Sequence, residues 1–205
     1  MGTPPFAVAS LHALLDAGIE VAAVVTAPDR PAGRGRQPRM SAVKEFALTH
    51  PQLREHILQP ERLRDAGFLA QLDATGASLY VVVAFRMLPE VVWQRPALGT
   101  INLHASLLPK YRGAAPVNWA ILRGEAQTGV TIMKMDEGMD TGEIIAQASC
   151  PVPEDMTSAV LHEKLADMGA RLLSATLPAI KAGTICLQPQ EEAQASYATK
   201  MQKDL

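Results

Sequence analysis

The run SLYVVVAF, residues 78–85, constrains the fold most, because it is apolar at almost every position and shows no alternation. A strand that faces water on one side alternates polar and apolar residues, whereas a strand covered on both faces does not. The run therefore predicts a central strand of a sheet that has helices on both sides. Such strands are typical of α/β proteins with parallel sheets.

Strand-like and helix-like segments alternate along the rest of the chain. We expect strands over residues 20–26, 78–84, 99–104, 129–135 and 143–150, and helices over 6–16, 41–50, 89–95, 117–122 and 158–181. This alternation predicts a Rossmann-like α/β fold with a mostly parallel central sheet and helices on both faces. The chain opens MGTPPFAVASLHALL, a turn that leads directly into a helix, so we expect the first strand to be missing.

Composition excludes several classes of protein. A length of 205 residues suits one domain with one core, and a net charge of −2 gives no global field for nucleic acid or membrane. Two cysteines, Cys150 and Cys186, are too few for a metal or disulfide framework, although a single bridge stays open. No signal segment and no apolar run of roughly 20 residues is visible. We expect a cytoplasmic protein without metal or membrane contact.

Two polar residues interrupt the apolar strand within TINLHASLLPKYRGAAP, residues 100–116. Residues two apart on a strand share a face, so Asn102 and His104 project together while Ile101 and Leu103 point the other way. A lone buried histidine is usually a satisfied core residue, but an adjacent asparagine has no packing reason to be there. An amide donor beside an imidazole can serve an oxyanion and a proton.

The segment MKMDEGMDTGEII, residues 133–145, is predicted to be a tight turn between two strands. A plain turn is one interpretation. Calcium binding is disfavoured, because the alternate oxygen ligands and the closing glutamate of a calcium loop are lacking. A third interpretation gives Asp140 the role of holding the His104 imidazole and orienting a water molecule.

The segment TAPDRPAGRGRQPRMS, residues 26–41, is predicted to be an exposed, mobile loop that carries Arg30, Arg34, Arg36 and Arg39. A solvated charged loop is the ordinary interpretation. Arginines concentrated in a loop of a slightly acidic chain also suit a phosphate backbone. Composition leaves both interpretations open.

Together INLHASLLPKYRGAAP, TGVTIMKMDEGMDTGEII and TAPDRPAGRG resemble the methionyl-tRNA formyltransferases, within the wider family of enzymes that use 10-formyltetrahydrofolate. The resemblance implies transfer of a formyl group from folate N10 to the α-amino group of methionyl initiator tRNA. It implies that residues 1–182 form a catalytic domain truncated at its N-terminus, and that residues 183–205 are a linker towards an absent C-terminal tRNA-binding β-barrel domain. We also expect a monomer.

The resemblance further assigns roles to residues. It implies that Asn102, His104 and Asp140 are catalytic. The residues implied to bind the folate donor are Ser106, Leu107, Leu108 and Pro109, with Phe85, Arg86, Met87 and Leu88 at the pterin. The acceptor stem of the tRNA would be met by Arg30, Arg34, Arg36 and Arg39. No metal is implied.

Three functions are alternatives to tRNA formylation. The first is formyl transfer to a small amine, either a sugar nucleotide or a glycinamide ribonucleotide, for which an extended cationic loop has no use. The second is hydrolysis of formyltetrahydrofolate, which needs only water in place of the amine. The third is a non-catalytic nucleotide-binding module, which the absence of a G-x-G-x-x-G segment disfavours.

Overall fold

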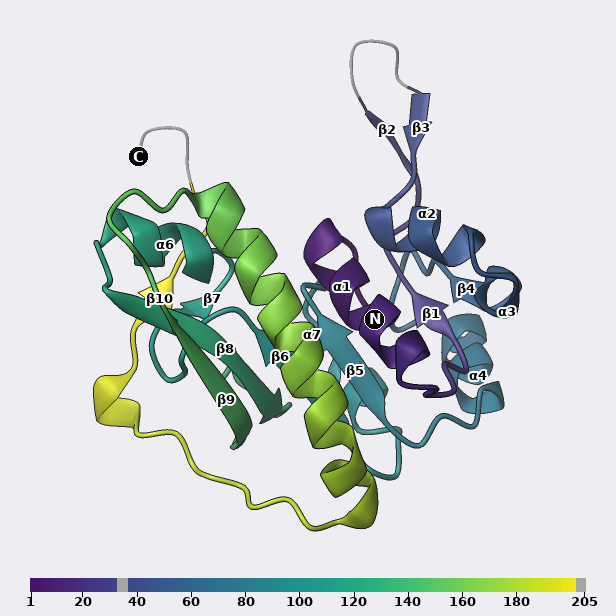
Figure 1. Cartoon of the computed structure of the whole chain (residues 1–205). Helices are drawn as coiled ribbons and strands as arrows, with labels where there is room; N and C mark the ends of the chain where they lie inside the picture. The colour runs from purple at the N-terminus through teal and green to yellow at the C-terminus, as the bar shows by residue number, and fades with distance from the viewer. Residues whose placement is uncertain (33–36, 202–205) are drawn as a thin grey trace. The chain divides into compact units, whose positions relative to one another are not determined.

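A computed structural model describes residues 1–32 and 37–201 of the chain (Figure 1). The chain forms two compact units, Met1–Thr100 and Ile101–Leu205. Both units mix helices with strands, so the predicted α/β class is confirmed. No helix among the described residues is both long enough and apolar enough to span a membrane.

The first unit contains short strands and mostly short helices. Strand β1 (Val24–Val25) pairs in parallel with β4 (Ile57–Leu58), which agrees with the predicted parallel pairing. The other elements are α1 (Pro5–Asp16), β2 (Arg30–Ala32), β3 (Gln37–Arg39), α2 (Ala42–Leu48), α3 (Pro51–Arg54), α4 (Ala66–Ala74), β5 (Tyr80–Val83) and α5 (Glu90–Trp93). The sequence did not predict α3, β4 or α4, each of which is short or weakly patterned.

Residues 1 and 2 lie between β1 and β5. The amide of Gly2 donates to the carbonyl of Val25 over 3.0 Å, and the amide of Val83 donates to the carbonyl of Met1 over 2.9 Å. Gly2 and Val83 form a parallel bridge. A Cβ atom at Gly2 would come within 2.8 Å of the Val83 carbonyl oxygen, so a side chain cannot be accommodated here without a shift. Gly2 thus forms an isolated parallel bridge at the start of the chain, and the expected missing strand stays a prediction.

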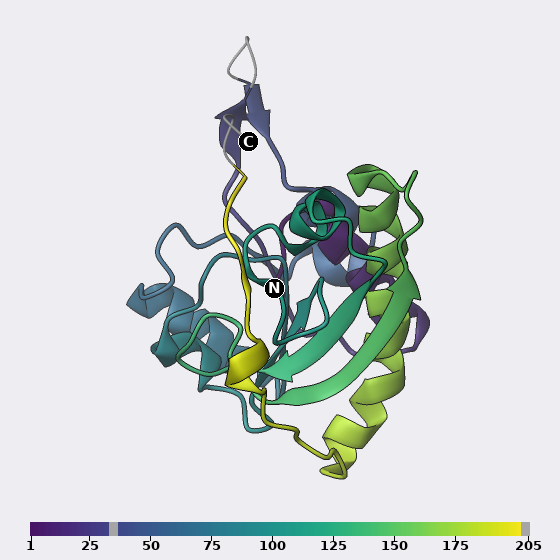
Figure 2. The ribbon, with the colours of Figure 1, turned by 90° about the vertical axis from the view of Figure 1, so that its left-hand side faces the viewer.

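The second unit is built on three antiparallel strands. Strand β6 (Thr100–His104) pairs with β8 (Gln127–Lys134), which pairs with β9 (Ile144–Pro151). Figure 2 shows β8 and β9 side by side, with α7 (Ser158–Ala182) along them. The remaining elements are β7 (Arg112–Gly113), α6 (Pro116–Leu122), a 3-10 turn η1 (Glu192–Gln194) and β10 (Tyr197–Ala198). The β8–β9 hairpin is antiparallel because the DEGMDTG turn joins its two strands directly.

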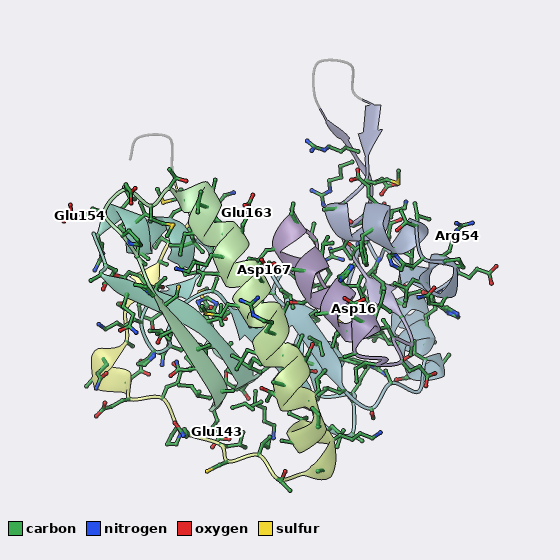
Figure 3. All side chains as sticks on the ribbon, in the orientation of Figure 1. Asp16, Arg54, Glu143, Glu154, Glu163 and Asp167 are labelled. Carbon is green, nitrogen blue, oxygen red and sulfur yellow. The ribbon has the colours of Figure 1, made fainter. Side chains whose placement is uncertain are left out.

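Helix α7 covers the antiparallel sheet with one apolar face. Leu161, Leu165 and Leu173 are fully buried, whereas Glu163 and Asp167 project into solvent (Figure 3). Thr157 caps the start of the helix by accepting a hydrogen bond from the amide of Val160, and Gly183 ends it in a left-handed conformation, φ 67°.

The contact between α7 and β6 is close. Gly169 of the helix lies so near Leu103 of the strand that a Cβ atom at position 169 would come within 2.6 Å of a Leu103 methyl group. Leu103 is buried against the helix, and its strand neighbours at 102 and 104 point to the opposite face. The packing of α7 therefore decides which face of β6 carries the polar residues.

Candidate active site

Strand β6 places Asn102 and His104 on one face, as its alternation predicts. Asn102 lies opposite Met133 of β8, and His104 lies opposite Thr131. His104 is 6% exposed and Thr131 is fully buried, so this face is covered rather than open sheet. Directly opposed residues of an antiparallel pair have neighbouring side chains, so the Thr131 and His104 side chains are neighbours on this face.

Asp140 meets both of these side chains from the turn after β8. Its Oδ1 accepts a hydrogen bond from Asn102 Nδ2 over 3.3 Å, and its Oδ2 lies 3.6 Å from His104 Nδ1. The backbone amide of Gly113 donates to Oδ2 over 2.8 Å. The structure therefore brings together the three residues that the sequence proposed as a catalytic set, all within the second unit.

The backbone around His104 determines its tautomer. His104 Nε2 lies 2.8 Å from the carbonyl oxygen of Tyr111. Because a carbonyl oxygen can only accept, Nε2 must carry the proton, and Nδ1 is left facing Asp140. Nδ1 is therefore the imidazole nitrogen that can gain or lose a proton on the side of Asn102 and Asp140.

The loop after β6 is held by Thr131. Its hydroxyl donates to the carbonyl of Ser106 over 2.7 Å and accepts from the amide of Leu108 over 3.1 Å. Gln147 of β9 donates to the same hydroxyl over 2.8 Å and to the carbonyl of Leu108 over 2.9 Å. One strand residue thus fixes the path of the chain immediately after His104.

The predicted folate residues of this loop differ in how they are used. The Ser106 hydroxyl is buried and donates to the carbonyl of Lys110 over 2.6 Å, and Leu108 packs in a buried cluster with Met133 and Ile144. Leu107 and Pro109 are partly exposed. Only these two have side chains available for a ligand, so Ser106 and Leu108 would act through the backbone or through packing.

The other predicted folate residues belong to the first unit. Met87 is 73% exposed, Leu88 is buried and Phe85 is partly exposed. Arg86 donates to the carbonyls of Glu61, over 2.9 Å, and Pro60, and its guanidinium lies 5.6 Å from the centre of the Phe85 ring. Their role at a pterin stays a prediction.

The arginine-rich segment was predicted to be a loop, but the part of it that the structure describes contains two short strands. Its ends form the antiparallel pair β2–β3, in which Arg30 lies opposite Arg39, and both residues are exposed. Two like charges placed directly opposite each other are destabilising. Arg34 and Arg36 lie outside the described residues. The pairing of β2 with β3 was not predicted, because the prolines and glycines that dominate the segment are typical of loops.

Polar contacts close the base of that segment. The hydroxyls of Thr26 and Ser41 lie 2.7 Å apart, and Asp29 accepts from Lys44 over 2.6 Å and from Gln59 over 2.8 Å. The hydrogen bonds from Lys44 and then Gln59 hold the pKa of Asp29 below its usual value. Asp29, the acidic residue in the cationic segment, therefore anchors its base.

Sequence reasoning missed three groups that contact the site residues. They are the Tyr111 carbonyl, the Gly113 amide and the Thr131 hydroxyl. In the structure, the φ of 112° at Gly113 suits glycine, and a Cβ atom there would lie 2.8 Å from the Ala198 carbonyl oxygen. Backbone partners of this kind carry no side-chain signal.

Among the described residues, no group of three or more His, Cys, Asp or Glu side chains could hold a metal ion.

Comparison with known proteins identifies the family. Residues 1–177 match the Formyl transferase family. A methionyl-tRNA formyltransferase of Bacteroides fragilis is 50% identical over 94% of this chain, which spans 58% of that protein's length.

Two solved structures are similar as well. One is the formyltransferase PseJ from Anoxybacillus kamchatkensis in complex with a UDP-sugar and tetrahydrofolate (30% identity, TM-score 0.60, 70% of this chain and 74% of that one). The other is a glycinamide ribonucleotide transformylase from Symbiobacterium toebii, with 20% identity and a TM-score of 0.74. The match covers 93% of this chain and 92% of that one, and it shows the same fold. The match over residues 1–177 and the similarity to the Bacteroides protein show that this chain belongs to the formyl transferase family.

Proposed function

We propose that this chain carries the site that transfers a formyl group from 10-formyltetrahydrofolate to the α-amino group of methionyl initiator tRNA. The observation that carries the proposal is the contact of Asp140 with both Asn102 and His104. The acceptor is inferred from the 50% identity with a methionyl-tRNA formyltransferase. The catalytic roles below are inferred from this geometry.

In this proposal Asn102 stabilises the oxyanion. Attack of the neutral amine on the formyl carbon turns the carbonyl oxygen into an anion that needs a hydrogen-bond donor. One hydrogen of the Asn102 amide is used by Asp140. The second hydrogen is available for the oxyanion, while Asp140 keeps the amide oriented.

His104 moves the proton. The attacking amine must lose a proton and N10 must gain one before the bond from the formyl carbon to N10 breaks, so no net proton is consumed. His104 Nδ1 is placed for this transfer, because Nε2 stays bonded to the Tyr111 carbonyl. Asp140 stabilises the imidazolium that forms when Nδ1 is protonated. No covalent intermediate on the protein is needed.

The donor is proposed to be a folate. The structurally similar PseJ, 30% identical, was solved with tetrahydrofolate. Leu107 and Pro109, which follow His104 closely and are partly exposed, would contact it. The four residues 85–88 remain the proposed pterin contacts, with the exposed Met87 and the ring of Phe85 as their apolar surfaces.

The tRNA is proposed to contact the arginine segment. Arg30 and Arg39 are exposed and opposed, so a phosphate placed between them would relieve their repulsion. Arg34 and Arg36, which lie outside the described residues, are proposed to contact the tRNA as well. We further propose that the protein acts in the cytoplasm, where charged initiator tRNA is available, and as a monomer.

The test is a comparison of acceptors. The chain is incubated with 10-formyltetrahydrofolate labelled in the formyl group and with methionyl initiator tRNA, an amino sugar nucleotide, glycinamide ribonucleotide or no amine. The proposal predicts that the label is recovered in formylmethionyl-tRNA. Label in a small amine would assign a different acceptor to the same site, and label in formate without any amine would make the protein a hydrolase.

A further inference from the structure

The segment after α7 returns to the loops that surround the site. Gln188 pairs with Ile144 of β9 through both backbone groups, at 2.8 and 2.9 Å. Nine residues later β10 pairs in parallel with β7, and Figure 2 shows this segment, in yellow, running back past the ends of β8 and β9. Residues 188–199 are thus bonded to the rest of the second unit, and the role of residues 183–205 as a linker stays a prediction.

Gln190 in this segment joins two loops through its side-chain amide. Its Nε2 donates to the carbonyl of Asp140 over 2.8 Å and to the carbonyl of Gly142 over 2.7 Å. Its Oε1 accepts from the Nε and Nη2 of Arg112, over 3.1 and 2.9 Å. Both donors and the acceptor oxygen of the amide are therefore used.

Arg112 connects this amide to the other side of the site. Its side chain is fully buried, and its guanidinium is held by Gln190 and by a salt bridge to Glu192 at 2.9 Å. The residues on either side of Arg112 supply the Tyr111 carbonyl that contacts His104 and the Gly113 amide that contacts Asp140. Gln190 thus reaches the backbone on both sides of the carboxylate.

The backbone at Asp140 needs such support. Its φ of 55° lies in the left-handed region, which costs a residue with a side chain roughly 1–2 kcal/mol. Glycine at position 140 would adopt this conformation with less strain, but glycine has no carboxylate. The hydrogen bond from Gln190 acts on the carbonyl of Asp140 itself, so it fixes the peptide that aims the carboxylate at Asn102 and His104.

We propose that Gln190 is a positioning residue, which holds the Asp140 carboxylate against His104 Nδ1 by joining the Asp140 turn to the Tyr111–Gly113 backbone. The effect of Gln190 on turnover rests on the proposed formyl transfer at this site. The effect of Gln190 on the position of the carboxylate is independent of that function and can be measured without a substrate.

Two variants separate the parts of this arrangement. Gln190→Leu removes all of its side-chain hydrogen bonds. Gln190→Glu keeps an acceptor for Arg112 but replaces the donor to Asp140 and Gly142 with an oxygen that repels their carbonyls. Gln188→Leu is the matched control, because Gln188 is exposed and its bonds to Ile144 are made by backbone atoms.

The substrate-free measurement is the amide resonance of Gly113 in a two-dimensional NMR spectrum, since this amide donates to Asp140 Oδ2. Asp140→Asn gives the reference for a lost carboxylate. We expect Gln190→Leu and Gln190→Glu to move the Gly113 amide proton towards its position in Asp140→Asn, and Gln188→Leu to leave it unchanged. An unchanged Gly113 resonance in folded Gln190→Glu would overturn the proposal.

The second measurement is the split between kcat and KM. A misplaced catalytic group costs on the order of 100-fold in rate, so we expect kcat to fall about 10- to 100-fold in both Gln190 variants while KM for the folate stays within about 3-fold. A normal kcat with lowered thermal stability would assign Gln190 a structural role only. If the unsubstituted chain transfers no formyl group, the proposed function fails, and the Gly113 resonance still decides the positioning role.

Discussion

Replacing Thr131 with valine removes one hydroxyl and keeps the shape of the side chain. In the structure this hydroxyl, on a fully buried residue opposite His104, donates to the carbonyl of Ser106 and accepts from the amide of Leu108. Valine can satisfy neither group. Gln147 loses its bond to the Thr131 hydroxyl but keeps its bond to the carbonyl of Leu108. Because Gln147 is exposed, its freed N–H can bond water, so this loss adds little to the cost.

The loss of folding free energy follows from the two backbone groups that lose their hydrogen-bond partner, the Ser106 carbonyl and the Leu108 amide. A buried polar group left without a hydrogen bond costs roughly 1–3 kcal/mol, so the two together cost about 2–6 kcal/mol. The added methyl group returns roughly 0.8 kcal/mol. We therefore expect Thr131→Val to lower the free energy of unfolding by about 3 kcal/mol.

Urea denaturation followed by far-UV circular dichroism measures this change. The control is Thr128→Val on the same strand, because Thr128 is also buried and the hydrogen bonds to the Ser106 carbonyl and the Leu108 amide are made by Thr131 and not by Thr128. We expect the control to change the unfolding free energy by less than about 1 kcal/mol. Equal effects of the two substitutions would refute the argument that the Thr131 hydroxyl holds the loop after β6.

Three further predictions concern the turn and the arginine segment. Gly142→Ala should lower the free energy of unfolding by at least about 3 kcal/mol, since its Cβ would overlap the carbonyl oxygen of Lys134, a backbone atom that cannot rotate away; an unchanged urea midpoint would contradict this. The lowered pKa of Asp29 stabilises the fold above the usual carboxyl pKa of about 4 and this stability is lost as pH falls through the lower folded pKa. Lys44→Met should therefore flatten the loss of thermal stability on acidification, and an unaltered profile would be the contrary result. Arg30→Ala should reduce the slope of log Kd for tRNA against log salt by about 1 and leave folate binding unchanged; an unchanged slope would exclude a phosphate contact.

The long patterned elements could be predicted from the sequence. The run 158–181 was expected to be a helix and α7 spans Ser158–Ala182, and the apolar runs around 129–135 and 143–150 correspond to β8 and β9. The polar face of β6 followed from the two-residue spacing of Asn102 and His104. Strong periodicity and strand alternation are local properties, so a single sequence reveals them.

Several parts of the site could not be predicted, because they depend on contacts between distant segments. Gln190 reaches Asp140 across fifty positions, and it lies in a stretch whose composition resembles a linker. The Tyr111 carbonyl and the Gly113 amide are backbone groups, which any residue supplies.

If Asp140 acts with Asn102 and His104 in formyl transfer, Asp140→Asn must slow the reaction far more than a similar change elsewhere in the turn. The matched control is Asp136→Asn, four residues earlier in the same turn, whose carboxylate accepts bonds from Gly138 and Thr141. Formation of formylmethionyl-tRNA is measured in a single turnover with excess protein. We expect the rate to fall roughly 10²- to 10⁴-fold for Asp140→Asn and less than about 3-fold for the control. Equal rates for the two variants would exclude a catalytic role of Asp140.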